Sequence, residues 1–122
     1  KTMIKGFIEQ TKPRTAYERD TLLPIIIQGI QAKVGKEKAI TNHEICKALR
    51  NQGHKISNPR LRKIINHIRT NNLVIGLIAT SDGYYIAENK GELLTYLESL
   101  KGRENAIRVV RLSLENQLVL YE

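Results

Sequence analysis

The sequence lacks most of the residues that would build a disulfide-stapled, membrane-spanning or aromatic-rich protein. Its single cysteine, Cys46, excludes an internal disulfide framework, and with five Tyr, one Phe and no Trp the core must be mainly Ile and Leu. No apolar run approaches the roughly 18 residues that a transmembrane helix needs. The N-terminus also lacks the long apolar centre of a secretory signal. We therefore expect a cytoplasmic chain that makes no membrane contact.

Acidic residues are missing from one long stretch of the chain. Residues 45–81 contain seven Lys or Arg and no Asp or Glu, whereas residues 88–122 contain five basic and six acidic side chains. The formal net charge is +8 and the pI is about 9.8. A surface that serves only solubility mixes both signs. The localised excess favours a polyanionic partner, nucleic acid above all.

Patterns typical of enzymes and metal sites are also missing. The stretch "GIQAKVGKE" fails as a phosphate loop because Gly29 and Gly35 stand one residue too far apart and Glu37 replaces the magnesium-binding Ser or Thr. No pair of carboxylates stands at a catalytic spacing. No CxxC or HxxxH pair supports a zinc site among His43, Cys46, His54 and His67. We expect no catalytic residues, no metal and no cofactor.

The N-terminal part divides into an arm and a helix. Residues 1–19 show no clean period and are predicted to form an arm, either a flexible tail or one with a short extended piece at 3–8. A broad apolar stripe then predicts a helix over 21–34. Asp20 is its expected N-cap, and Gly35 its expected end.

Two further helices follow. After "KAI", a candidate short strand, Thr41 and Glu44 form a capping box that predicts a helix over 42–52. "SNPRLRKIINHIRT" then begins with Ser57 or Asn58 as N-cap and Pro59 in the first turn, and its helix is predicted to reach residue 71. Its inward apolar stripe is Leu61, Ile64, Ile65 and Ile68.

The next stretch changes from helical to strand character. In "LVIGLIATSDGYYIA", β-branched and aromatic residues flank Asp82-Gly83, a turn signal because Gly tolerates positive φ. The pattern predicts a hairpin with strands at 74–80 and 84–87. Because side chains alternate along a strand, Tyr84 and Tyr85 must point to opposite sides. We expect one in the core and the other half-buried on the outer face.

The C-terminal part is predicted to form one long helix over 90–120, capped by Asn89 with Glu92. Its apolar residues follow alternating steps of three and four, which is typical of a helix that pairs with another. Glu104 and Arg111 interrupt this seam and could cross-pair in an antiparallel arrangement. The helix could pack on its own domain or form a homodimer, and we favour the homodimer.

Three helices followed by a hairpin resemble the winged helix-turn-helix domains of the biotin-repressor type. The resemblance covers residues 21–88 and rests on "SNPRLRKIINHIRTNNLVIGLIATSDGYYIA", with Ser57 at the helix start and Gly83, Tyr84 and Tyr85 at the hairpin. The extension "LLTYLESLKGRENAI" looks like small winged-helix proteins of phages and integrated elements. Pro59 departs from the family pattern, since it has no N–H to donate to phosphate. The implied architecture is α+β and mostly α, with an arm (1–19), a winged-helix domain (20–88) and a C-terminal helix (89–122).

The resemblance implies a helix that enters the major groove of double-stranded DNA. Asn58, Arg60 and Lys63 are then the expected contacts to base edges, because Arg and Lys suit guanine and Asn suits adenine. We expect the phosphate contacts to come from Arg62, Arg69, Lys47, Arg50 and Lys55, with Ser81 at the hairpin tip.

Two function classes follow from these expectations. The first is a sequence-preferring DNA-binding protein, a dimeric transcriptional regulator or a phage-type DNA-binding protein. The alternative is a winged-helix protein-interaction module of a replication, packaging or assembly complex. Such a module would normally show exposed apolar anchors on the third helix, and none stands clear of its core stripe.

Overall fold

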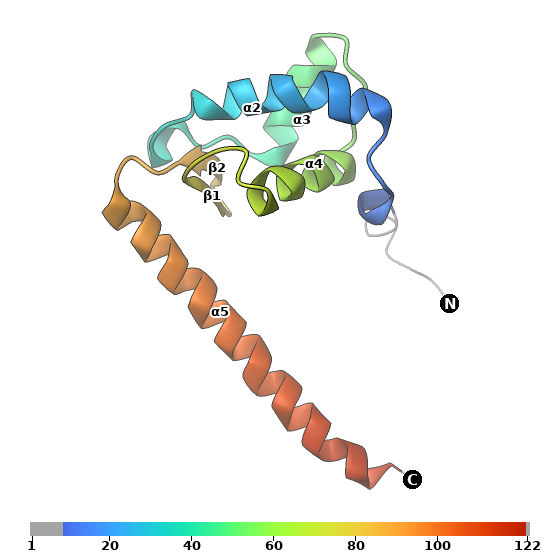
Figure 1. The fold of residues 1–122 in the computed structure, drawn as a ribbon, viewed down its shortest axis with the longest axis vertical. Coiled ribbons are helices and arrows are strands. Elements are labelled where there is room, and N and C mark those ends of the chain that lie inside the picture. The colour runs from blue at the N-terminus through green and yellow to red at the C-terminus, as the bar shows by residue number, and fades with distance from the viewer. Residues whose placement is uncertain (1–8, 122) are drawn as a thin grey trace. The chain divides into compact units, whose positions relative to one another are not determined.

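The computed structural model describes residues 9–121, and the chain divides into two compact units on either side of the boundary between Glu88 and Asn89 (Figure 1). The described part of the first unit contains a helical turn at residues 9–11, three longer helical segments, a short 3₁₀ helix η2 (Lys36–Lys38) and one antiparallel pair of strands, and the second unit is a long helix. This confirms the α+β, mostly helical character expected from the sequence. The extended piece expected at residues 3–8 lies outside the described residues.

The first helix begins earlier than the sequence indicated. Thr15 and Glu18 form a capping box, in which Glu18 N donates to Thr15 Oγ1 (3.1 Å) and Thr15 N donates to Glu18 Oε1 (2.8 Å). A π-helical turn, η1 (Glu18–Leu22), follows and continues into α2 (Leu23–Gln31). The prediction of Asp20 as N-cap of a helix over 21–34 was therefore wrong, because the cap lies five residues before Asp20.

The next two helices begin where their caps predicted. In α3 (Asn42–Asn51), Thr41 and Glu44 form the expected capping box. In α4 (Asn58–Thr70), the Ser57 hydroxyl accepts from the backbone N–H of Arg60 at 3.3 Å, and proline stands in the first turn. Both helices end within about one residue of the predicted positions, because capping and apolar periodicity are local signals.

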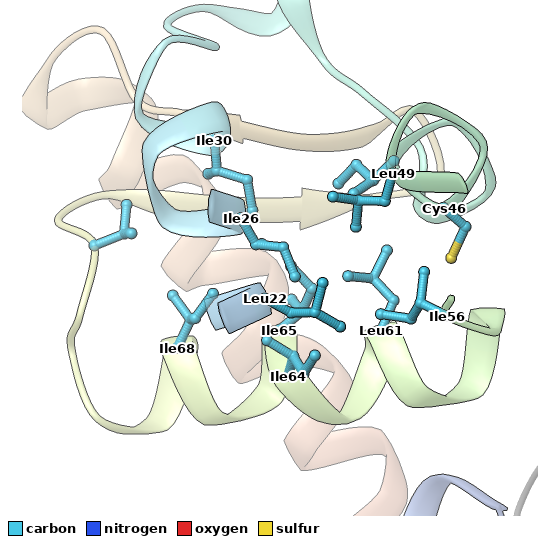
Figure 2. Packing of buried hydrophobic residues seen from close by; sticks show 12 residues of the cluster. Leu22, Ile26, Ile30, Cys46, Leu49, Ile56, Leu61, Ile64, Ile65 and Ile68 are labelled. Atoms are coloured by element: carbon cyan, nitrogen blue, oxygen red, sulfur yellow. The ribbon is translucent and has the colours of Figure 1, made fainter. Parts of the chain in front are cut away.

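The core is an aliphatic cluster between α2, α3 and α4. Figure 2 shows its side chains pointing toward one another from these helices and from Ile56 before α4. The predicted inward stripe of α4 is at most 2% exposed throughout. Cys46 is also fully buried, and burial raises the pKa of its thiol, so it behaves as a small core residue. This packing fixes which face of α4 points outward.

The strand pair consists of β1 (Leu77–Thr80) and β2 (Gly83–Ile86), joined by a two-residue turn at Ser81-Asp82. Gly83 has φ +121°, and a Cβ there would lie 2.5 Å from the backbone C and O of Ile40. Ile40 itself pairs with Tyr84 through two backbone hydrogen bonds of 2.8 and 3.0 Å. The hairpin is confirmed, although β1 starts three residues later than expected because the chain turns at Gly76 with φ +76°.

The two hairpin tyrosines are both largely covered. Tyr84 packs against the core cluster and donates its hydroxyl hydrogen bond to Asn42 Oδ1 at 2.9 Å. Tyr85 is 6% exposed. One tyrosine is buried and the other half-buried, as expected. Tyr84 thus ties the hairpin to the start of α3.

The second unit contains α5 (Lys90–Asn116) followed by a 3₁₀ turn, η3 (Gln117–Leu120). Asn89 caps it as predicted, accepting from the N–H of Glu92 at 2.9 Å. Every residue from 101 to 121 is exposed. Among residues 9–121, no helix is both long and apolar enough to cross a membrane.

Candidate nucleic-acid interface

The outward face of α4 carries cations and amides and no acid. Helical spacing places Arg62 and Arg69 along one edge of this face and Lys63 with His67 along the other, with Asn66 between them. Both arginines and Asn66 are exposed, whereas Lys63 and His67 are half-buried. This acid-free basic face has the charge that a polyanion would match.

Arg60 does not belong to that face. Its Nε and Nη2 donate to the two carboxylate oxygens of Glu18 at 2.9 and 2.6 Å, which makes a bidentate pair. Its remaining N–H groups donate to the carbonyl oxygens of Glu9 (2.7 Å), Lys12 (2.9 Å) and Pro13 (2.9 Å). A guanidinium has five N–H donors, and these bonds occupy all of them.

The guanidinium of Arg60 therefore has no donor left for a guanine, and its side chain is only 12% exposed. We name this set of contacts from Arg60 to Glu18 and to residues 9–13 the Arg60 clamp. It replaces the base contact that the sequence led us to expect at Arg60. The clamp instead fixes the N-terminal segment against the start of α4.

Asn58 is also poorly placed for a base contact. Its carbonyl oxygen accepts from Asn42 Nδ2 at 3.0 Å, which joins the starts of α3 and α4. Its side-chain Oδ1 is buried and finds no hydrogen-bond partner within the described part of the chain. The hydroxyl of the neighbouring Ser57 donates to Glu9 Oε2 at 2.5 Å. The beginning of α4 is thus occupied by protein contacts.

Glu18 is the partner of Arg60 that the sequence did not indicate. Its hydrogen bonds from Arg60, the largest cause, hold the pKa of its carboxyl below the ordinary value despite its burial. The side chain is 9% exposed. A signal was present, because "TAYE" before "RDTLLPII" is a capping-box pattern, but it gives no indication of Arg60, which lies 42 residues away.

The other predicted phosphate contacts are distributed over α3 and α4. Lys47 and Lys55 are exposed. Arg50 Nη1 donates to the carbonyl oxygen of Ile56 at 3.0 Å and so braces the connection between the two helices. Arg62 Nε donates to Gln10 Oε1 at 3.2 Å, and the N–H groups of its two Nη atoms take no part in this bond.

The hairpin tip is exposed but carries an acid. Ser81 and Asp82 form the two-residue turn, and Lys36 lies 3.7 Å from the Asp82 carboxylate. Both partners of this ion pair are more than half exposed, so it adds little stability. Its effect is to offset the negative charge beside Ser81.

A polar cleft lies between the N-terminal segment and α4. It is lined by Pro13, Arg14, Lys63, Asn66, His67 and Thr70. Arg14 was not among the residues singled out from the sequence, because nothing local indicates that it meets α4. The structure thus brings a cation of the arm beside two basic residues of the helix.

Within residues 9–121, no group of three or more His, Cys, Asp and Glu side chains is arranged to hold a metal ion. Comparison with known proteins adds no family: no family model, curated protein or solved structure matches the chain.

Proposed function

We propose that this chain is a winged helix-turn-helix protein that binds double-stranded DNA with sequence preference through the outward face of α4. The observation that carries the proposal is that α4 buries a continuous apolar stripe and turns an acid-free, basic face to solvent. A solvated helix needs no such segregation of charge.

The element order supports the winged-helix assignment. Helix α2, a single paired residue at Ile40, helices α3 and α4, and the hairpin follow one another along the chain. The hairpin is tied to the start of α3 by the pairing of Tyr84 with Ile40 and by the hydroxyl of Tyr84 on Asn42. A helix of 13 residues is about 20 Å long and fits the major groove.

The contacts to DNA are reassigned by the Arg60 clamp. Asn66, exposed in the middle of the outward face, takes the base-reading role that we expected of Asn58, because an amide pairs well with adenine. Arg62 and Arg69 contact phosphates along one edge, and Lys47 and Lys55 extend that basic surface. Ser81 approaches the backbone at the hairpin tip.

The same proposal includes a homodimer formed through α5, as in dimeric transcriptional regulators. Ile107, Val110 and Leu114 on α5, with Leu118 in the following turn η3, form one apolar strip, and each is more than half exposed. The helix carries five basic and four acidic side chains, so a second copy would meet little net repulsion. Arg111 forms an ion pair with Glu115 at 2.6 Å within the same helix. This pair lowers the desolvation cost of burying the Arg111 charge between two copies of α5.

The test of DNA binding is fluorescence anisotropy of a labelled random-sequence duplex at several salt concentrations. If the protein neutralises about six phosphates, log K falls against log salt with a slope of roughly −5. Selection from a randomised duplex pool then measures sequence preference. A protein that binds no duplex even at low salt contradicts the proposal, and its basic face then fits an acidic protein partner better.

Asn66→Ala separates base reading from simple charge attraction. It leaves the charge unchanged, so non-specific affinity and the salt slope stay as in the wild type. Preference at one base pair falls by about 1–3 kcal/mol, the usual value of a bidentate amide contact.

A further inference from the structure

The cleft between the N-terminal segment and α4 is built from two parts of the chain that are distant in sequence. Lys63, Asn66, His67 and Thr70 follow one another at helical spacing along α4, and Pro13 and Arg14 form the facing wall. Its volume is about 330 Å³, at the lower end of the range for clefts that hold small ligands. None of its described lining residues is acidic.

The backbone at Arg14 is held by hydrogen bonds to its own carbonyl oxygen and to those of the two residues before it. The Arg60 clamp binds the carbonyl oxygens of Lys12 and Pro13, and Arg19 Nη1 donates to the carbonyl oxygen of Arg14 at 2.9 Å. The backbone around Arg14 is therefore held in place by two guanidinium groups. Arg60 thus affects the surface indirectly. By holding the backbone of residues 12 and 13, it helps to place Arg14 beside Lys63.

His67 adds an imidazole ring to the lining of the cleft. Its Nδ1 lies 3.0 Å from Asn71 Nδ2, which also donates to the carbonyl oxygen of His67 at 2.9 Å. An amide nitrogen donates and does not accept, so Nδ1 acts as the acceptor and the neutral ring carries its proton on Nε2. Asn66 and Thr70 supply further polar atoms on the same wall.

The charges around His67 come from both elements that face it. Burial, and then the positive charges of Arg14 and Lys63, lower the pKa of His67. Both cations therefore lie close enough to the His67 ring to disfavour its charged form. An anion bound beside the ring would oppose that effect.

We infer that the cleft lined by Arg14, Lys63 and His67 binds a phosphate group. Arg and Lys supply charge-assisted hydrogen bonds, and the imidazole supplies a third donor. The phosphate comes either from the DNA backbone or from a free phosphorylated compound. In the first case the inference rests on the proposed function, and the N-terminal segment becomes part of the DNA interface and not merely a cover for α4.

NMR titration of the His67 ring tests the site directly. The pKa of His67 is measured in the intact chain with sodium chloride, with inorganic phosphate at equal ionic strength, and with a short duplex. His67→Gln assigns the signal among the three histidines. A phosphate bound in the cleft raises the pKa of His67 by about one unit, because a neighbouring anion favours the charged ring.

Three variants identify the residues responsible. Arg14→Gln and Lys63→Gln each abolish the upward shift, whereas Lys12→Gln, the same charge change next to the cleft, preserves it. Lys12 is a suitable control because only its backbone carbonyl belongs to the Arg60 clamp. Equal losses in all three variants would mean general charge attraction and would overturn the inference.

The arms of the titration also separate the inference from the proposed function. A shift with the duplex places a backbone phosphate in the cleft, and a shift with inorganic phosphate alone identifies a free phosphorylated ligand. Either result supports a phosphate site. A duplex that binds by anisotropy while neither phosphate source moves the pKa of His67 overturns the cleft and leaves DNA binding intact.

Discussion

Helices α4 and α5 both begin at a side-chain N-cap, but the apolar residues of α4 are buried and most of those in α5 are exposed. Each starts at a side-chain N-cap, Ser57 in one and Asn89 in the other. In α4 the four residues of the apolar stripe are at most 2% exposed, whereas in α5 Ile107 is 70% and Leu114 is 57% exposed. Periodicity therefore predicts which residues share a face, and only the surrounding structure decides what covers that face.

The two helices should differ most in the free energy of unfolding that is lost when one isoleucine in each is replaced by alanine. Ile64 is fully buried and Ile107 is mostly exposed. Ile64→Ala should lower the free energy of unfolding by about 3 kcal/mol, through lost burial and the cavity left behind. Ile107→Ala should change it by less than about 0.5 kcal/mol at concentrations where the chain is monomeric. Urea unfolding followed by circular dichroism measures both, and equal losses would contradict the contrast between the helices.

Removal of the Arg60 clamp should lower the free energy of unfolding by a similar amount. Arg60→Gln leaves the carboxylate of Glu18 buried without its cation, which should cost about 3 kcal/mol. Arg62→Gln, one charge removed from the exposed edge of the same helix, should cost less than about 0.5 kcal/mol. A double-mutant cycle with Glu18→Gln measures the coupling. Additive effects of the two substitutions would show that the pair contributes nothing as a pair.

Acid should weaken the first unit through the same pair. The folded-state pKa of Glu18 lies below its ordinary value, so the contribution of its ionised form is fully present above the ordinary pKa of 4.5. That contribution is lost as the pH falls through the lower folded-state value. Urea midpoints measured from pH 6 to pH 3 should fall less steeply in Glu18→Gln than in the wild type, and parallel curves would refute this assignment.

Substitutions on α5 should change the association of two chains, which depends on protein concentration, and should change the stability of the first unit little. Leu114→Glu places a charge on the apolar strip and should shift sedimentation toward the monomer without lowering the stability of the first unit. Glu104→Leu combined with Arg111→Leu should leave the dimer intact or tighten it, because both substitutions make the seam apolar. A wild-type chain that sediments as a monomer at high concentration would rule out the homodimer.

Most of the fold was predictable because its signals are local. Thr41, Ser57 and Asn89 mark helix starts through bonds to residues three positions away, and Asp82-Gly83 signals a turn that the structure places one residue earlier, at Ser81-Asp82. These patterns depend on backbone groups that must be satisfied within one turn of the chain. The early start of the first helix was missed although "TAYE" carries the same signal, since Asp20 stands closer to the apolar run.

The candidate site was predictable only in part. Its basic face on α4 follows from helical spacing, and Arg62, Lys63 and Arg69 lie where the sequence indicated. The roles of Arg60 and Arg14 could not be read from the sequence, because each depends on a contact with a segment about 50 residues away. A basic residue beside a helix start is equally suited to a phosphate or to a carboxylate of the same chain.

The most direct measurement compares charge removal on the two helices. Arg62→Gln with Arg69→Gln removes two cations from α4, and Lys101→Gln with Arg103→Gln removes two exposed cations from α5. Duplex affinity is measured against salt for both variants. We predict that the α4 variant loses about two units of the roughly −5 slope while the α5 variant keeps it. Equal slopes for the two variants would contradict the assignment of DNA binding to the outward face of α4.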